Sequence, residues 1–380
     1  MRAGRALGRL CWLSSWLAGV AGCTRPSAER ARQDAQIGQA ESAELRVGVA
    51  GGHAVVRELS PGYISLWASA PRLELQLDYR AAPPAELWLE VANCMPQAEL
   101  RMPQAELTRV PAAPLLSSER DAGGVCRFQL ALPAELRELE LTLGPPDSVR
   151  PSRFRFAVLS DVQEAIQRVQ DIFTRLNQLT EAAPGIDFLL GAGDLTSQGT
   201  GEELERFQTE LLGLRIPYYT TLGNHELGQN PTLFHEYFGR GSQSFDYRGV
   251  RFSLIDSASA TVDPIVFDWL DEWLQPSASP LHVVAMHIPP LDPTGVRNGA
   301  FASRSEAAKL LARLAEGGVD LTLYGHIHSY YHFQNAGIPA YISGGGGSIP
   351  ERFDQMGRHF LVVDADPEAG SLEVRVVRVD

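Results

Sequence analysis

The chain has 380 residues, a hydrophobic fraction of 44% and a net charge of -13, from 33 Lys and Arg against 46 Asp and Glu. This length predicts two domains with hydrophobic cores of their own. The excess of acidic residues gives no electrostatic basis for binding a polyanion, so we expect no nucleic-acid partner.

Residues 1–22 have the pattern of an export signal. Several arginines precede an apolar stretch over residues 10–21, which is too short to span a bilayer comfortably. The stretch ends in the letters VAGC, which resemble the lipobox of bacterial lipoproteins and imply lipidation of Cys23. We therefore expect an exported protein, attached through a lipid anchor to the bacterial cell envelope, on its periplasmic or outer surface. An ordinary cleaved signal with an incidental cysteine is the alternative.

Residues 23–43 are polar and lack apolar periodicity, so they predict a flexible tether. Beyond the signal and Cys23, two cysteines remain, Cys94 and Cys126, and an oxidising compartment allows them to form a disulfide. Such a disulfide would stabilise this region by about 3 to 4 kcal/mol on the chain-entropy model. Two free buried thiols are the alternative.

Residues 44–147 predict a small antiparallel β domain. Short alternating runs are separated by Pro, Gly and polar turns, which is typical of a β sandwich. The clearest runs are 63–68, 73–79, 87–92, 126–132 and 139–143. A Gly-Pro-Pro sequence at 144–146 marks the domain boundary.

Residues 151–380 alternate between predicted strands and helices, which indicates an α/β layered fold with a mostly buried central sheet. Apolar residues at helical spacing over 166–179 predict the first helix. The predicted strands are 153–160, 186–192, 217–222, 252–255, 281–286, 321–324, 340–343, 360–363 and 372–379.

Nearly every side chain suited to metal binding lies just beyond the carboxyl end of one of these strands. The residues in question are Asp161, Asp194, Asn224, His225, His287, His326 and His328. Ligand sites of α/β sheets form at these ends, so residues far apart in sequence can meet in one cleft. Carboxylates, imidazoles and an amide oxygen suit two divalent ions such as Mn²⁺, Fe²⁺ or Zn²⁺, with Mg²⁺ as a further candidate.

A carboxylate shared by two such ions holds them about 3.5 to 4 Å apart. The ion pair lowers the pKa of a bridging water, so that a hydroxide nucleophile exists near neutral pH, and it neutralises phosphate oxygens. These are the requirements for hydrolysing an anionic phosphate ester.

Five segments occur in an order that resembles the motif blocks of the calcineurin-like metallophosphoesterases. They are Asp161-Val162-Gln163, Gly193-Asp194, Gly223-Asn224-His225-Glu226, Met286-His287 and Gly325-His326-Ile327-His328. The resemblance covers residues 153–380 and implies a mixed central β sandwich flanked by helices, here preceded by the small β domain. It implies a hydrolase of phosphoric ester bonds, whose substrate is a phosphomonoester or a phosphodiester.

Carried over by position, the resemblance assigns each motif residue a role. The first metal would be held by Asp161, Asp194 and His328, and the second by Asp194, Asn224, His287 and His326. Asp194 would then bridge both metals. His225 would be the catalytic imidazole that stabilises or protonates the departing oxygen, oriented by Glu226.

The two-domain plan also resembles purple acid phosphatases, which carry a tyrosine three residues after the bridging aspartate. Ser197 stands at that position, so a tyrosinate-bound ferric ion is not expected.

Gln163 departs from the family's usual Asp-x-His block. A Gln carbonyl can coordinate a metal but binds a borderline ion less tightly than imidazole, so we expect the first site to be weaker or to prefer a harder ion such as Mn²⁺ or Mg²⁺. The alternative is a catalytically weakened lipoprotein with a partner-binding or structural role.

Substrate contacts are predicted at Arg297, Arg304 and His332, together with Asn224. Solvated loop charges are the alternative for the two arginines. Beyond the phosphate-ester substrate and the membrane anchor, no protein partner is predicted.

Overall fold

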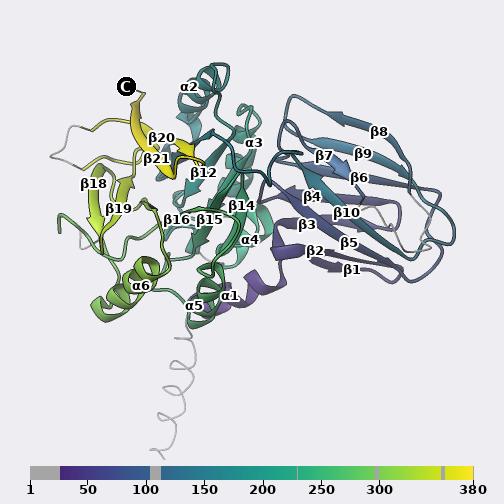
Figure 1. Ribbon diagram of the computed structural model, residues 1–380, viewed down its shortest axis with the longest axis horizontal. Coiled ribbons are helices and arrows are strands. Elements are labelled where there is room, and N and C mark those ends of the chain that lie inside the picture. Colours follow the sequence, from purple (N-terminus) through teal and green to yellow (C-terminus); the bar gives the residue numbers. More distant parts are fainter. Residues whose placement is uncertain (1–25, 103–112, 229, 296–298, 352–355, 380) are drawn as a thin grey trace, which may run out of the picture.

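The computed structural model describes residues 26–102, 113–228, 230–295, 299–351 and 356–379, which form a β domain beside a larger layered domain (Figure 1). The predicted signal at 1–22 and Cys23 lie outside the described residues. In the described parts of the chain, no helix has the length and apolar character needed to cross a bilayer.

The β domain consists of two five-stranded sheets packed face to face. One sheet has the order β1-β2-β5-β10-β7 and the other β3-β4-β6-β9-β8. The strands are β1 (Gln39–Glu41), β2 (Leu45–Val49), β3 (Ala54–Ser60), β4 (Tyr63–Ala68), β5 (Leu73–Tyr79), β6 (Glu86–Ala92), β7 (Glu99–Arg101), β8 (Leu115–Arg120), β9 (Cys126–Ala131) and β10 (Glu138–Gly144). Alternate residues such as Leu73, Leu75 and Leu77 are buried between the sheets, as the alternating sequence predicts. Neighbouring strands are antiparallel except β4 and β6, which are parallel. The predicted β sandwich is therefore confirmed.

Cys94 and Cys126 form a disulfide with a Cα–Cα distance of 6.0 Å. The preceding residue, Asn93, connects the two domains. Its amide nitrogen donates to the carbonyls of Ala68 and Tyr218, both at 2.7 Å, and its amide oxygen accepts from the Tyr218 nitrogen at 2.8 Å. The disulfide therefore lies beside a hydrogen-bonded junction with the larger domain.

The larger domain contains two facing sheets. Their orders are β13-β12-β11-β20-β21 and β14-β15-β16-β17-β19-β18. The strands are β11 (Phe154–Leu159), β12 (Phe188–Ala192), β13 (Tyr218–Thr221), β14 (Gln243–Tyr247), β15 (Val250–Ile255), β16 (Leu281–Met286), β17 (Leu321–Tyr324), β18 (Tyr330–Asn335), β19 (Ile338–Ser343), β20 (His359–Asp366) and β21 (Ser371–Arg378). Aromatic rings fill the space between the sheets: Phe156 stacks on Phe188 at 5.6 Å and meets Phe252 edge-on at 5.1 Å.

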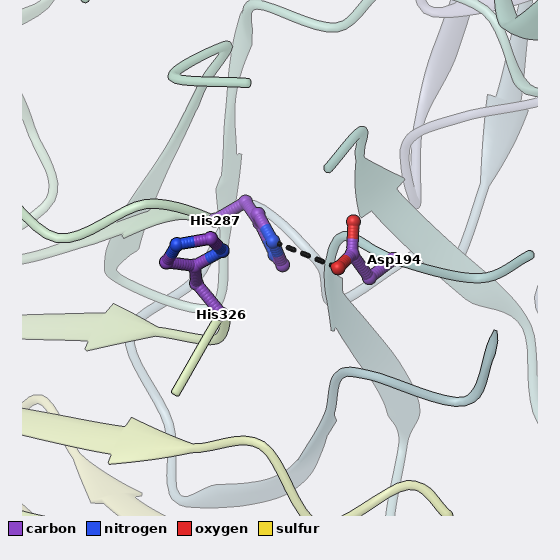
Figure 2. A group of neighbouring side chains, drawn as sticks. All are labelled: Asp194, His287 and His326. Carbon is purple, nitrogen blue, oxygen red and sulfur yellow. Dashed lines mark ion pairs between the residues drawn. The ribbon is translucent and has the colours of Figure 1, made fainter. Parts of the chain in front are cut away.

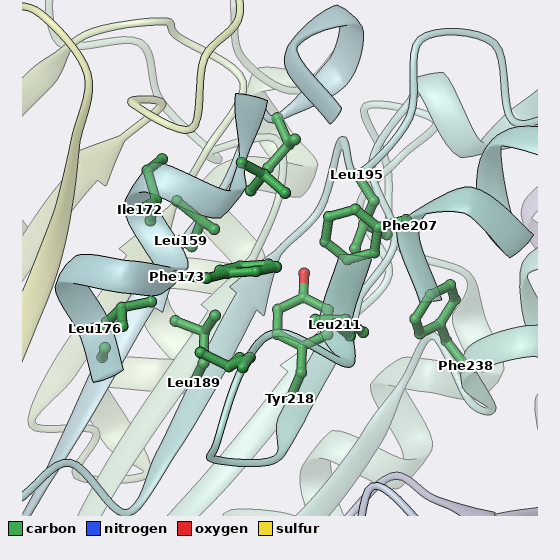
Figure 3. Packing of buried hydrophobic residues seen from close by; sticks show 14 of the residues in the cluster. Leu159, Ile172, Phe173, Leu176, Leu189, Leu195, Phe207, Leu211, Tyr218 and Phe238 are labelled. Carbon is green, nitrogen blue, oxygen red and sulfur yellow. The ribbon is translucent and has the colours of Figure 1, made fainter. Parts of the chain in front are cut away.

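Helices cover the outer faces of both sheets. On the first sheet they are α2 (Gln170–Thr180) and α3 (Gly201–Leu211), and on the second α5 (Pro264–Trp273) and α6 (Arg304–Glu316). Figure 3 shows Phe173 of α2 and Phe207 of α3 against Tyr218 of β13. Shorter elements are η1 (Ala50–Gly52), η2 (Gln163–Arg168), η3 (His225–Leu227) and α4 (Leu233–Phe238). The predicted layered α/β fold is confirmed.

Residues 26–36 form helix α1 (Pro26–Gln36), which differs from the flexible tether expected over 23–43. Its Ala31 is buried in the core beside α5, but most of its contacts with the larger domain are polar. Arg30 is fully buried and pairs with Asp256 at 2.6 Å. Asp34 accepts hydrogen bonds from two main-chain N–H groups just before β14, at 2.7 and 2.9 Å. Apolar periodicity could not reveal a helix that is fixed mainly by buried charged groups.

Candidate metal centre

Parallel strands from both sheets bring the predicted ligands to one edge of the domain. In the first sheet β11, β12 and β13 run parallel, and in the second β15, β16 and β17 do so. The loops after their carboxyl ends carry Asp161, Asp194, Asn224, His225, His287, His326 and His328. This arrangement follows the general rule for α/β sheets and explains why residues from distant segments converge.

Two groups of three side chains among the described residues have ligand atoms within 4.8 Å of one another. They are Asp161, Asp194 and His328, and Asp194, His287 and His326. Figure 2 shows the second group, in which an Asp194 carboxylate oxygen lies 3.2 Å from His287 Nε2. Because Asp194 belongs to both groups, the geometry suits two adjacent cations that share one carboxylate.

Main-chain carbonyls hold two imidazole rings so that the Nε2 atom of each faces the carboxylates of the centre. His287 Nδ1 lies 2.8 Å from the Ala192 carbonyl oxygen, and His328 Nδ1 lies 2.7 Å from that of Ile349. A ring nitrogen facing a carbonyl carries a proton, so in the neutral ring, which is the form that binds a metal, Nε2 keeps its lone pair. His328 Nε2 then lies 3.4 Å from Asp161 and His287 Nε2 faces Asp194.

The centre is buried, and the Asp194 carboxylate favours a positive charge on the imidazole next to it. Asp161 and His287 are 0% exposed and Asp194 is 1% exposed. Burial acts to lower the pKa of His287, but the adjacent Asp194 carboxylate dominates and raises this pKa to about 9. Burial lowers the pKa of His326 to about 4. Two closely spaced buried carboxylates need compensating cations, which divalent metals would supply.

Four residues of the centre have a left-handed backbone conformation, although none is glycine. Their φ angles are 62° at Asp161, 44° at Gln163, 54° at Asp194 and 69° at His326. Each such residue costs on the order of 1 to 3 kcal/mol, and strained residues of this kind cluster at functional sites. The surrounding fold therefore holds these side chains in place at an energetic cost.

Two glycines allow the strand-end loops to approach each other closely. A Cβ on Gly223 would lie 2.1 Å from Asp194 Oδ1. A Cβ on Gly325 would lie 2.0 Å from the Ser160 hydroxyl, which donates to Asp161 Oδ2 at 2.6 Å. Neither contact is compatible with a side chain, so both positions require glycine while the carboxylates keep their places.

Gly223→Ala is expected to displace the Asp194 carboxylate and weaken metal binding by about 10- to 100-fold, the range typical when the support of a ligand is lost. Bound metal measured by mass spectrometry after dialysis checks this. Gly201→Ala is the matched control, because its Cβ would meet Tyr237 at 3.4 Å and Leu233 at 3.9 Å, both ordinary van der Waals contacts with side chains. Wild-type metal content in Gly223→Ala would contradict the role given to this glycine.

Gln163 lies within the first group but presents a donor to it. Its Nε2 donates to Asp194 Oδ2 at 2.7 Å and lies 3.3 Å from His328 Nε2. Reversal of the amide would bring Oε1 to the same place, where it could coordinate a cation. Coordination by Gln163 therefore stays a prediction.

Asn224 and His225 lie at the more open side of the centre. Asn224 Oδ1 is 3.1 Å from His287 Nε2. His225 donates from Nδ1 to the Ser197 carbonyl at 2.6 Å, and its Nε2 lies 3.9 Å from Asp194. The His225 side chain is 35% exposed, so a substrate can reach it.

Glu226 does not hold His225 as expected, because its hydrogen bonds go elsewhere. Its carboxylate accepts from the main-chain nitrogens of Asp194, Thr196 and Gly223 at 2.8 to 2.9 Å and from the Thr196 hydroxyl at 2.8 Å. Burial and the neighbouring Asp194 carboxylate raise the pKa of Glu226, whereas these donated hydrogen bonds lower it. Glu226 thus fixes the loop that carries Asp194, and the Ser197 carbonyl orients His225.

Two further predicted substrate contacts, Arg304 and His332, have no hydrogen bond to the residues of the centre within the described parts of the chain. Arg304 is exposed at the first residue of α6, and His332 in β18 stacks on Tyr341 with ring centroids 4.3 Å apart. Arg297 lies outside the described residues. The main-chain carbonyls that orient the imidazoles could not be predicted from the sequence, because every residue has a main-chain carbonyl.

Comparison with known proteins agrees with this geometry. Residues 154–330 match the calcineurin-like phosphoesterase family. A 3',5'-cyclic-nucleotide phosphodiesterase of Nostoc sp. is 30% identical over 192 residues, which are 45% of this chain and 69% of that protein. A probable cyclic nucleotide phosphodiesterase of Synechococcus sp. is 27% identical over 220 residues, 52% of this chain and 79% of that protein.

A solved purple acid phosphatase from yellow lupin (Lupinus luteus) seeds shares the fold, with a TM-score of 0.52 at 15% identity. The match covers 81% of this chain and 70% of the lupin chain. The resemblance seen in the motif blocks is thus confirmed at the level of the family: the chain belongs to the calcineurin-like phosphoesterases and is a hydrolase of phosphoric ester bonds.

Proposed function

We propose that this protein is a phosphodiesterase with a dinuclear metal centre, and that 3',5'-cyclic nucleotides are its substrate class. The observation that carries the proposal is the pair of Asp and His groups that share Asp194. The choice of a diester is supported by the names of the two relatives, which this chain covers over 69% and 79% of their lengths.

The residues present fit two divalent cations. The first would be held by Asp161, Asp194 and His328, with Gln163 as a further ligand, and the second by Asp194, Asn224, His287 and His326. This nitrogen and oxygen donor set suits Mn²⁺, Fe²⁺, Zn²⁺ or Mg²⁺. When bound, such a pair supplies a hydroxide nucleophile at neutral pH and neutralises phosphate oxygens.

His225 would deliver the proton that the departing oxygen needs. Its Nδ1–H is used in the hydrogen bond to the Ser197 carbonyl, so Nε2 is the nitrogen that faces the centre. An imidazolium protonated at Nε2 can act as a general acid. The 35% exposure of this side chain leaves room for substrate beside it.

The test is hydrolysis of 3',5'-cyclic AMP, bis-para-nitrophenyl phosphate and para-nitrophenyl phosphate by protein lacking residues 1–23, a truncation that removes none of the described residues. The protein is stripped of metal and then supplied with Mn²⁺, Zn²⁺, Fe²⁺ or Mg²⁺. Metal-dependent turnover with diesters preferred supports the proposal. A preference for the monoester overturns the phosphodiesterase assignment, and no turnover with any metal overturns the enzyme as a whole.

A weakened lipoprotein with a partner-binding role is the second candidate, and Gln163 alone favours it. Gln163→His supplies the imidazole that is usual in the family. We expect it to raise the metal affinity of the first site by roughly tenfold or more, which is the size of effect that changes around metal ligands typically have. Turnover measured against Mn²⁺ concentration checks this. Gln167→His, at an exposed position of the same short helix, is the control. An unchanged metal dependence would show that Gln163 does not limit the site.

We also propose that Cys23 is acylated and holds the protein at the cell envelope, on the strength of the lipobox-like sequence. The full chain is produced in a bacterium that is supplied with an alkyne-tagged fatty acid. We expect the protein to carry the label and to be found in the membrane fraction. Cys23→Ala should lose both properties. An unlabelled wild-type protein cleaved at another residue would contradict the anchor.

A further inference from the structure

A cavity of about 200 Å³ lies directly beside His328. Its lining includes glycines of the loop after β19, together with Arg168, Pro350 and Met356. Pockets that enclose a whole small ligand usually measure about 300 to 1,000 Å³. This cavity is therefore the right size for one group of a substrate whose phosphate lies at the metal centre.

The glycine wall of the cavity is fixed rather than adaptable. The main-chain nitrogen of Gly346 donates to the Ser160 carbonyl at 2.8 Å, and that of Ser348 donates to the Asp161 carbonyl at 3.0 Å. A Cβ on Gly345 would lie 2.3 Å from His359 Nδ1. The loop is thus packed against the segment that carries Asp161, and a wall of glycine main chain has no side chains that would obstruct a flat ring.

Arg168 is the cationic side chain that remains available in this cavity. It is the last residue of η2 and is exposed, and its guanidinium has no hydrogen-bond or ion-pair partner within the described parts of the chain. The neighbouring Arg358 is used structurally, because it pairs with Asp171 and donates to the Arg168 carbonyl at 3.0 Å. A guanidinium is planar, carries only donors and stacks on aromatic rings.

We propose that this cavity binds the nucleobase of the diester substrate and that Arg168 is its specificity-determining contact. This inference rests on the proposed phosphodiesterase function. A nucleobase matches the cavity in three respects: it is a single planar ring system, it carries hydrogen-bond acceptors for the guanidinium, and its face packs against Pro350 and Met356. Placed there, the base lies next to His328 while its cyclic phosphate reaches the metal pair.

The experiment compares two substrates that differ only at the base. They are 3',5'-cyclic AMP and the 3',5'-cyclic phosphate of methyl β-riboside, in which a methoxy group replaces the base. We expect the wild-type protein, supplied with metal, to prefer cyclic AMP by about tenfold or more in kcat/KM, as base stacking typically provides. Arg168→Ala should remove most of this preference, mainly by raising the KM for cyclic AMP.

Arg168→Lys separates recognition of a base from simple charge attraction. Lysine keeps the charge but loses the planar stacking surface, so it should resemble Arg168→Ala. Arg175→Ala, at an exposed position of α2, is the control and should keep wild-type kinetics.

Several results would overturn the subsite. They are equal kcat/KM values for the two substrates in the wild type, equal losses on both in Arg168→Ala, or full rescue by Arg168→Lys. Failure of the wild type to hydrolyse either substrate with any metal would instead overturn the phosphodiesterase proposal, and the subsite with it.

Discussion

Asp194→Ala is expected to lower kcat/KM for diester hydrolysis by about 100- to 1,000-fold or more, the loss seen when one group that stabilises transition-state charge is removed. The expected loss is at the upper end because Asp194 belongs to both ligand groups and also accepts the hydrogen bond from Gln163. Steady-state hydrolysis of bis-para-nitrophenyl phosphate with saturating Mn²⁺ measures the effect, and elemental analysis should show less bound metal.

Asp268→Asn is the matched control for this change, because it alters a carboxyl group at an exposed position of α5 in the same domain. It should leave both metal content and turnover at wild-type values. An Asp194→Ala protein that keeps wild-type turnover would show that the two groups do not form one centre.

His225→Ala should lower kcat by about 100- to 10,000-fold on a substrate with an alkoxide leaving group, the range of a lost general acid. The loss should be much smaller with bis-para-nitrophenyl phosphate, because para-nitrophenolate departs without protonation. Because His225 belongs to neither ligand group, the amount of bound metal should stay unchanged. Cyclic AMP and bis-para-nitrophenyl phosphate are compared side by side at one metal concentration.

The dependence on the leaving group is the decisive part of this prediction. If His225→Ala lowered turnover equally for both substrates, the imidazole would act in binding the phosphate and not as the acid, because the main-chain hydrogen bond from residue 225 to Asp194 at 3.0 Å is retained in the variant. If bound metal fell as well, His225 would belong to the metal-binding residues.

The candidate ligands could be found from the sequence because their positions follow a simple rule. Alternating and continuous apolar runs mark the strands, and ligand sites of α/β sheets form just beyond the carboxyl ends of the parallel strands. The observed β4, β5, β16 and β17 have the predicted bounds. The ordered motif blocks then indicated which of these residues belong together, and the structure brings Asp161, Asp194 and the three histidines into two groups that share Asp194.

Features that depend on the main chain or on distant pairing could not be found in this way. The main-chain carbonyls of Ala192, Ser197 and Ile349 orient three imidazoles. Every residue has such a carbonyl, so the sequence cannot indicate which ones take this role. The resemblance implied that Glu226 orients His225, whereas its hydrogen bonds are to the Asp194 loop. The sequence does not distinguish Arg168 from other exposed arginines, because the cavity beside it forms only when the glycine loop is folded.

Helix α1 also determines how the protein would be presented by an anchor at Cys23. Three residue steps separate Cys23 from Pro26, where α1 begins, and a fully extended chain covers at most about 11 Å over that distance. Arg30 and Asp34 hold α1 to the domain that carries the metal centre. Acylation would therefore keep the metallophosphoesterase domain close to the bilayer and restrict its rotation, so that the enzyme would meet its substrate in the thin layer of solution next to the lipid headgroups.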